Sequence, residues 1–168
     1  LFKIVRKLQP SSCVELGSCV GVSASYQAAA LKLNSKGKIV TLEGSEEVAT
    51  IASETLSNLE LSNSSVVIGP FHQTLMEVFK NSDPIDLFFN DGHHDRDAVI
   101  NYFEKVLPYL SKNAVIVIDD ISWSPGMKSA WMEIENDPRV SASINLDSIG
   151  IALIQANVGT KEKFVIPL

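Results

Sequence analysis

The stretch Val14–Ser23, which reads VELGSCVGVS, decides how the chain begins to fold. An apolar, β-rich run over Ser12–Leu16 leads into Gly17, and a helical pattern follows over Val22–Leu33. Gly17 and Gly21 permit a tight turn that brings backbone N–H groups toward a ligand at the N-terminus of that helix. The sequence therefore predicts a strand, a glycine turn and a helix, which is the first unit of an α/β fold.

The alternation of strand-like and helical patterns continues along the chain. Further apolar runs typical of strands are Lys38–Glu43, Ser65–Ile68, Ile85–Asn90 and Ala114–Asp119. Helical patterns separate them over Glu46–Leu59, Thr74–Lys80 and Arg96–Leu110. Because these strands are continuous apolar runs, we expect a parallel sheet with helices on both faces.

The pattern changes after Asp120. A helix near Met127–Glu135 precedes two runs, Val140–Leu146 and Gly150–Gln155, and the short link between them permits an antiparallel hairpin but no crossover helix. The whole order predicts an α/β fold with a doubly wound, mostly parallel, seven-stranded sheet that ends in a C-terminal antiparallel hairpin.

Composition narrows the class of protein. The chain has 168 residues, 45% of them hydrophobic, and a formal charge of -6, which suits one domain over 1–168 and argues against a nucleic-acid partner held by a broad basic surface. No apolar run is long enough to span a membrane. Cys13 and Cys19 lack a wider cysteine framework, which favours free thiols in a reducing cytoplasm. The opening LFKIVRKLQP resembles the last turns of a helix, so we expect a missing N-terminal segment.

Candidate binding residues follow every strand of the predicted parallel sheet. In open α/β sheets ligands bind at the carboxyl ends of the strands. All five runs end in a carboxylate, a glycine or both, at Glu15 to Gly21, Glu43 and Gly44, Gly69 to Phe71, Asp91 to His94, and Asp119 with Asp120. The sequence therefore predicts one ligand site along this edge.

The two acids at the first strand ends indicate the ligand. A nicotinamide-dinucleotide turn would read G-x-G-x-x-G, but here Cys19 occupies the position of the middle glycine. Glu15 suits an ammonium group better than a pyrophosphate, and Glu43 is placed to accept hydrogen bonds from ribose hydroxyls. S-adenosylmethionine carries both an adenosine end and a cationic amino-acid end.

These residues together resemble the class I S-adenosylmethionine-dependent methyltransferases, with their Rossmann-like fold, and within them the small O-methyltransferase-like group that includes catechol O-methyltransferase. VELGSCVGVS resembles the first motif of that group, DLFFNDGHHDRDAV the D-G-x-H motif of bacterial methyltransferases, and IDDISWSPGMKSAW a segment of bacterial relatives. The resemblance covers nearly all of the chain from Val14 onward. It implies an enzyme that methylates a small-molecule acceptor.

The resemblance also implies roles for individual residues. It places Glu15, Gly17, Ser18 and Ser23 at the methionine end of the cofactor, with Cys19 and Gly21 in the same turn. Glu43 and Gly44 are expected at the ribose, and Gly69, Pro70, Phe71 and His72 at the adenine. Asp91, Gly92 and His93 are expected beside the sulfonium.

Two interpretations stay open for the acidic residues near the reacting centre. In the resemblance, the metal ligands of catechol-type enzymes fall on Asp91, Asp119 and Asp120, which predicts Mg2+ or another divalent cation. Alternatively, Asp91 and Asp119 only end strands and Asp120 lies at a loop. His94 falls where those enzymes have a lysine, so it is a candidate general base, a metal ligand or a residue that orients Asp91.

The predicted reaction is direct transfer of a methyl group to an acceptor oxygen. Asp91 and His94 are its candidate catalytic residues, and Trp123 is a candidate wall of the acceptor pocket, whereas Trp131 is expected in the core. One alternative is a catalytically silent cofactor-binding or scaffold protein of the same fold, and another is a nicotinamide-dependent oxidoreductase. The free edge of the terminal hairpin makes a homodimer conceivable.

Overall fold

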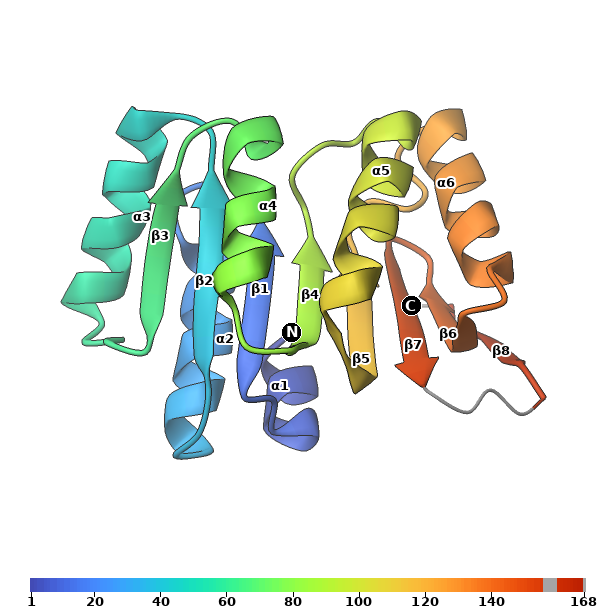
Figure 1. The fold of residues 1–168 in the computed structure, drawn as a ribbon, viewed down its shortest axis with the longest axis horizontal. Coiled ribbons are helices and arrows are strands. Elements are labelled where there is room, and N and C mark those ends of the chain that lie inside the picture. Colours follow the sequence, from blue (N-terminus) through green and yellow to red (C-terminus); the bar gives the residue numbers. More distant parts are fainter. Residues whose placement is uncertain (156–159, 168) are drawn as a thin grey trace. The chain divides into compact units, whose positions relative to one another are not determined.

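The structure is a computed structural model that describes residues 1–155 and 160–167. It contains two compact units, Leu1–Ile85 and Asp86–Leu168, and each is described by itself. Figure 1 shows the helices and strands that make up each unit.

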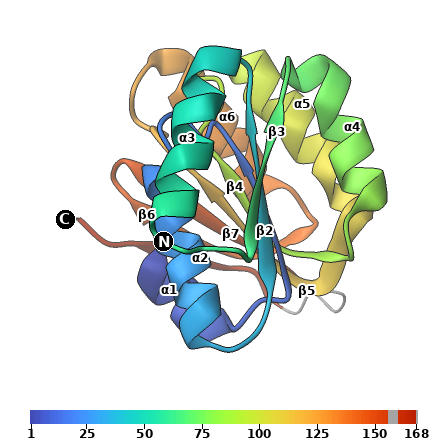
Figure 2. The ribbon, with the colours of Figure 1, turned by 90° about the vertical axis from the view of Figure 1, so that its left-hand side faces the viewer.

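The first unit alternates helices and parallel strands. Its elements are α1 (Phe2–Leu8), β1 (Ser12–Leu16), α2 (Val22–Leu33), β2 (Lys38–Glu43), α3 (Glu46–Asn58), β3 (Ser64–Ile68) and α4 (Phe71–Asn81). β2 pairs in parallel with β1 on one side and with β3 on the other, so all three strands end at the same edge. Helices α2 and α3 cover one face of these strands and α4 covers the other (Figure 2), which confirms the predicted double winding in this unit.

Local sequence explains how these helices start. Ser45 caps α3 by accepting the N–H of Val48, and two acids in the first turn, Glu46 and Glu47, favour the positive end of the helix dipole. Pro70 precedes α4, and its fixed φ allows the helix to begin at Phe71 rather than at Thr74, where periodicity alone predicts its start.

The second unit begins in β4, and its C-terminal strands pair in both antiparallel and parallel directions. Its elements are β4 (Ile85–Asn90), α5 (Arg96–Val106), the 3-10 turn η1 (Leu107–Tyr109), β5 (Leu110–Ile118), α6 (Pro125–Asn136), β6 (Val140–Leu146), β7 (Ile149–Gln155) and β8 (Glu162–Val165). β7 pairs antiparallel with β5 and β6, and β8 pairs in parallel with β6. The predicted hairpin is thus confirmed, and Asp147 makes its tight turn with φ 69.

Three further features depart from the sequence-based expectation. The described residues hold eight strands rather than seven, because the short and charged segment EKFV of β8 carries no apolar strand pattern. Helix α5 ends at Val106 rather than Leu110, since Pro108 disfavours a continued α-helix. The next strand accordingly starts at Leu110 rather than Ala114 and stops at Ile118.

Buried apolar side chains form the core of each unit. Leu16, Leu42 and Phe79 are buried in the first unit, and Trp131 is 3% exposed in the second, as predicted. The Trp131 ring packs directly against Gly150. A Cβ atom at position 150 would lie only 2.6 Å from this ring, so close packing here requires glycine. In residues 1–155 and 160–167, no helix combines the length and the apolar content needed to cross a membrane.

Candidate functional site

The glycine turn after β1 has the tight geometry that the sequence predicts. Gly17 and Gly21 have φ 88 and φ 87, which glycine adopts without the steric cost that other residues meet. The N–H groups of Gly17 and Ser18 both donate to the carbonyl oxygen of Leu42, at 3.0 and 3.1 Å. Cys19 also lies in the left-handed region, with φ 45. A non-glycine residue held there is strained, which is typical of functional loops.

The carboxylate of Glu43 is tied to this turn. Glu43 ends β2 and is partly buried, and its Oε2 accepts the backbone N–H of Cys19 at 2.9 Å. Its Oε1 accepts the N–H of Ser45 at 3.1 Å. An ionised carboxylate can accept about four hydrogen bonds. Glu43 is therefore fixed in position by the backbone and keeps acceptor capacity for the hydroxyl groups of a ligand.

Glu15 has a different environment from Glu43. Its side chain is fully buried, and its carboxylate accepts hydrogen bonds from Ser23 Oγ and from Gln27 Nε2, the latter at 2.8 Å. Ser23 is partly exposed. A ligand would thus meet the charge of Glu15 mainly through Ser23.

Gln27 and Thr41 are two residues of this region that the sequence analysis does not identify. Gln27 is completely buried on a face of α2 whose other buried residues are alanine and leucine. A polar residue within this apolar stripe was the sequence signal that could have identified it. Thr41 is buried in β2, and its Oγ1 lies 2.6 Å from Ser18 Oγ. Gln27 thus fixes the side chain of Glu15 in β1, and Thr41 fixes that of Ser18 in the glycine turn.

The residues after β2 and β3 are only partly available to a ligand. Gly44 is exposed, and Gly69, with φ 133, donates its N–H to the carbonyl oxygen of Glu43 at 2.9 Å. Phe71 is 8% exposed in the first turn of α4, whereas Pro70 and His72 are exposed. The structure thus places Gly69 beside Glu43, while the adenine contacts of Pro70, Phe71 and His72 stay predictions.

In the second unit, His94 lies between two carboxylates. Its Nε2 is 3.4 Å from Asp91 Oδ1 and 3.3 Å from Asp120 Oδ2. All three side chains are about one third exposed, with values of 34%, 30% and 37% for His94, Asp91 and Asp120. Two acceptors at Nε2 favour a proton on that nitrogen, which leaves Nδ1 as the basic nitrogen.

The acids of this cluster interact unfavourably with one another. The pKa of Asp91 is raised to about 6, first by burial and then by the nearby charge of Asp119, whereas His94 acts to lower it. Asp120 adopts a left-handed conformation, with φ 54, and its backbone N–H donates to Asp119 Oδ1 at 2.9 Å. The carboxylates share one histidine, so their charge is incompletely compensated.

The predicted metal set is not assembled as a ligand group in the structure. In the part of the chain that the structure describes, no group of three or more His, Cys, Asp or Glu side chains is placed to hold a metal ion. The divalent cation at Asp91, Asp119 and Asp120 therefore stays a prediction.

The other predicted residues of this unit flank the cluster. Gly92 is partly exposed, and its N–H lies 3.4 Å from Asn90 Oδ1. The Nδ1 of His93 is 2.5 Å from the hydroxyl of Tyr102, and the two rings stack with centroids 5.8 Å apart. Trp123 is 72% exposed, and its ring centroid is 6.4 Å from that of His94. Trp123 thus has an open aromatic face near the candidate base.

Several solved structures share this fold. The O-methyltransferase from Bacillus cereus, in complex with SAH, is 24% identical with a TM-score of 0.78, and the match covers 92% of this chain and 78% of that one. Cofactor-bound Rv0187 from MTB is 22% identical with a TM-score of 0.81, over 93% and 78% of the two chains. The O-methyltransferase TomG from Streptomyces achromogenes, in complex with SAM, is 20% identical with a TM-score of 0.76, over 92% and 78%. At these identities the matches show the fold.

A family match shows the relationship more directly. The model of the methyltransferase domain family matches residues 14–121, which is more than half of the chain. That range runs from the glycine turn after β1 to the end of the acidic cluster after β5. A search among curated proteins finds no match. On the family match, the chain belongs to the methyltransferase domain family, as its sequence motifs indicate.

Proposed function

We propose that this protein transfers a methyl group from S-adenosylmethionine to an oxygen atom of a small-molecule acceptor. The observation that carries the proposal is the carboxylate of Glu43, fixed by the N–H groups of Cys19 and Ser45 beside the glycine turn. Membership of the methyltransferase domain family supports the same reaction type. The Bacillus cereus and Streptomyces achromogenes structures, which contain SAH and SAM, support the choice of cofactor.

The first unit would hold the cofactor at three points. Glu43 would accept hydrogen bonds from the two ribose hydroxyls with the lone pairs that the backbone leaves available. Ser23 would accept a hydrogen bond from the cofactor's ammonium group while it donates to Glu15, so the buried carboxylate stabilises the cation through one hydroxyl. The exposed backbone of Gly44 and the partly exposed backbone of Gly69 would border the nucleoside without side-chain obstruction.

The second unit would activate the acceptor. With its proton on Nε2, His94 would take the proton of the acceptor hydroxyl at Nδ1. Asp91 and Asp120 would then stabilise the resulting imidazolium, because both carboxylates lie within 3.4 Å of Nε2. The open ring of Trp123 would limit the orientation of an acceptor near this nitrogen.

The atoms and charges of this reaction balance. The bound cofactor supplies a methyl group on a positively charged sulfur. A bond forms between the acceptor oxygen and the methyl carbon as the bond from that carbon to sulfur breaks, and the hydroxyl proton is left on His94. Correct alignment of reacting groups can contribute about 7–11 kcal/mol to such a step. Positioning would therefore supply much of the rate enhancement.

A label-transfer assay tests the proposal. The purified protein is incubated with S-adenosylmethionine labelled in the methyl group and with a panel of catechols, other phenols, sugars and amines. Labelled O-methyl product from one class of hydroxyl acceptor is the expected result. Transfer to nitrogen alone would contradict O-methylation, and cofactor binding without transfer to any acceptor would favour a catalytically silent protein.

Parallel incubations with EDTA and with added Mg2+ test the predicted divalent cation. Full activity in the chelator would rule out a metal requirement, and loss of activity that Mg2+ restores would support Asp91, Asp119 and Asp120 as its ligands.

A further inference from the structure

The outer edge of β3 carries backbone groups without a strand partner. In residues 1–155 and 160–167, β3 pairs with β2 alone and ends the sheet on that side. The N–H of Ile39 donates to the carbonyl oxygen of Asn63, and the N–H of Gly69 donates to that of Glu43. Because parallel ladders use alternate residues, the N–H and C=O groups of Val66 and Ile68 point outward.

This edge lacks the features that normally block strand addition. Natural edge strands are blunted by charged residues, proline or bulges. β3 reads SSVVI, contains none of these, and keeps an unbroken register with β2. By contrast, the exposed strand β8 reads EKFV and begins with two charged residues. β3 is therefore open to pairing in a way that β8 is not.

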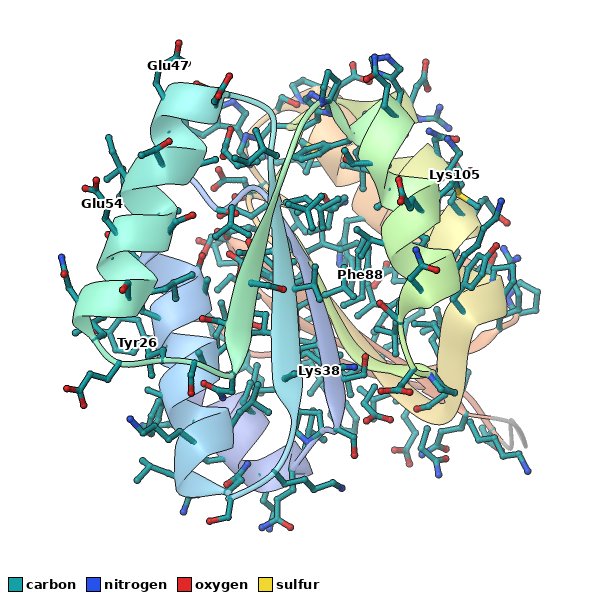
Figure 3. The ribbon with its side chains drawn as sticks, turned by 60° about the vertical axis from the view of Figure 1, so that its left-hand side comes forward. Tyr26, Lys38, Glu47, Glu54, Phe88 and Lys105 are labelled. Atoms are coloured by element: carbon teal, nitrogen blue, oxygen red, sulfur yellow. The ribbon has the colours of Figure 1, made fainter. Side chains whose placement is uncertain are left out.

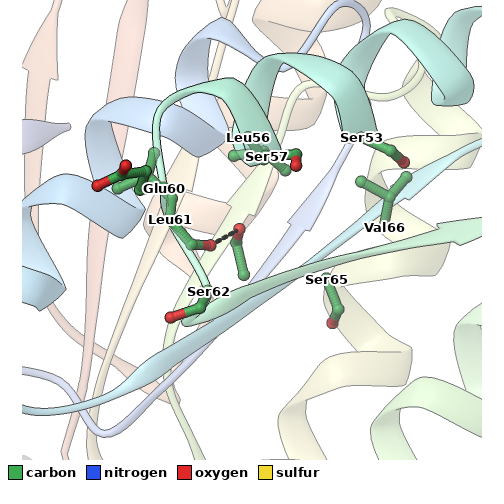
Figure 4. Close-up of a pocket in the computed structure, with 9 residues that line it drawn as sticks. Ser53, Leu56, Ser57, Glu60, Leu61, Ser62, Ser65 and Val66 are labelled. Carbon is green, nitrogen blue, oxygen red and sulfur yellow. Dashed lines mark hydrogen bonds between the residues drawn. The ribbon is translucent and has the colours of Figure 1, made fainter.

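Two grooves lie on the opposite faces of β3. One, of about 420 Å³, runs between α3 and β3 and is lined mostly by small side chains, among them Ser53, Ser57 and Ser62. Figure 4 shows Val66 pointing toward α3 in this groove, whereas Ser65 points to the other side. The second groove, of about 390 Å³, lies between β3 and α4 and includes Ser65 and Ile68. An added strand would have room for side chains on both of its faces.

The charge of both grooves favours a basic partner. Glu60 lines the first groove and Glu77 the second, and both are exposed. Among the described residues that line the two grooves none is a lysine or arginine, and the nearby Lys32 donates to the carbonyl oxygen of Glu60 rather than to its carboxylate. A second copy of this chain would bring the same two acids to the same edge, and like charges oppose association. A segment with lysine or arginine on both faces would instead pair with Glu60 and Glu77.

We propose that the outer edge of β3 binds an extended, basic segment of another polypeptide, which pairs as an additional strand. The backbone groups of Val66 and Ile68 provide the affinity, and Glu60 and Glu77 select basic side chains. The outward backbone groups of Val66 and Ile68 face away from β2, the strand that carries Glu43, so pairing with another polypeptide is a property beyond the proposed methyl transfer.

A peptide titration tests the pairing directly. The probe is acetyl-VKKVTKKV-amide, which places lysines on both faces of a strand, and binding is followed by the exchange of backbone amides in NMR spectra. The amides of Val66 and Ile68 should gain protection, while that of Val67, already directed to β2, should not change. A peptide with alternate amides N-methylated should not bind, because it cannot complete the ladder. Absence of protection at Val66 and Ile68 with about 1 mM peptide, a weak-binding limit, would overturn the proposal.

Variants separate backbone pairing from charge. Val66→Pro removes one outward N–H without a change in the ladder to β2, and should weaken binding at least about tenfold, whereas Val66→Thr keeps the N–H and should bind normally. Glu60→Gln with Glu77→Gln should weaken binding about three- to tenfold at low salt and hardly at all at high salt. Glu54→Gln is the matched control, because Glu54 lies on the outer side of α3 and points away from the strands (Figure 3).

Analytical ultracentrifugation without peptide tests whether a second copy of this chain occupies the β3 edge instead. A wild-type dimer that Val66→Pro dissociates would assign this edge to a second copy and overturn the proposal of a basic segment. A monomer that binds the lysine peptide but not its glutamate counterpart, acetyl-VEEVTEEV-amide, would support it.

Discussion

The carboxylates in the last residues of β1 and β2 differ from those just after β4 and β5 in how their charge is compensated. Glu15 and Glu43 each accept at least two hydrogen bonds from fixed donors of the first unit. Asp91 and Asp120 in the second unit instead face the same histidine nitrogen. A carboxylate whose charge is stabilised by fixed hydrogen-bond donors is prearranged to bind a ligand. Two carboxylates that share one histidine instead stabilise that histidine further when it gains a proton. The comparison therefore assigns cofactor binding to the first region and acceptor activation to the second.

Replacement of His94 should produce the largest effect and tests the second region. His94→Ala removes the proposed base, so kcat for methyl transfer should fall by about 10²–10⁴-fold, the range for general base catalysis. The affinity for S-adenosylhomocysteine should change by less than about twofold, since no cofactor contact is lost. Steady-state kinetics and a cofactor titration measure the two quantities.

The matched control for His94 is an exposed residue of the same unit that has no role in the proposed site. Asn101→Ala, on the exposed side of α5 and outside the acidic cluster, should leave kcat unchanged. Equal loss of activity in both variants would remove the proposed distinction between the two regions.

Replacement of Gln27 tests the compensation of the buried carboxylate in the first region. Gln27→Leu removes a donor to the fully buried Glu15, so the free energy of unfolding should fall by about 1.5–3 kcal/mol, the range for a hydrogen bond to a charged group. Urea denaturation followed by circular dichroism measures this. Gln73→Leu, on the exposed side of α4, is the control, and an unchanged stability in Gln27→Leu would show that Glu15 does not depend on this donor.

The pH dependence of the free energy of unfolding should show that the charge of Asp91 is poorly stabilised in the folded protein. Its pKa is raised to about 6 in the folded protein from an ordinary value of 3.8, mainly by burial. The folded state therefore binds more protons than the unfolded state between about pH 4 and 6, and stability falls as the pH rises through that window. Because Asp91 is partly exposed, we expect a contribution on the order of 1 kcal/mol after solvent screening.

Asp91→Asn separates this contribution from that of other acids. The variant lacks the titrating carboxyl, so the difference in unfolding free energy between variant and wild type should grow in favour of the variant from pH 4 to pH 6. Denaturation at several pH values measures it. A difference that is constant across this range would show that the pKa of Asp91 is not raised.

Much of the first region could be predicted from sequence because its signals are local. Glycine at 17 and 21 is required by positive φ values, and Glu43 ends an apolar run, so its place at the strand end follows from periodicity. Gln27 could not be assigned a partner, because its contact with Glu15 depends on how α2 packs against β1. Thr41 gave no signal for the same reason, since its contact with Ser18 joins β2 to the turn after β1.

The second region was predicted in its residues but not in its arrangement. The motif around Asp91 identifies His94, but the sequence does not show that one nitrogen lies near both Asp91 and Asp120. Asp120 also adopts a left-handed conformation, which is uncommon for a non-glycine residue and which the sequence does not indicate. β8 was missed because its pairing with β6, rather than its own composition, makes it a strand.

The central claim, that the carboxylate of Glu43 beside the glycine turn binds a sulfur nucleoside, is tested most directly by calorimetric titration with S-adenosylhomocysteine. Wild type should bind with a saturable heat, and Glu43→Ala should bind about 10–100-fold more weakly, as expected for the loss of hydrogen bonds to a charged group. Glu46→Ala, an exposed acid in the first turn of α3, should bind as wild type does. No binding heat from wild type, or equal affinity in wild type and Glu43→Ala, would contradict the account.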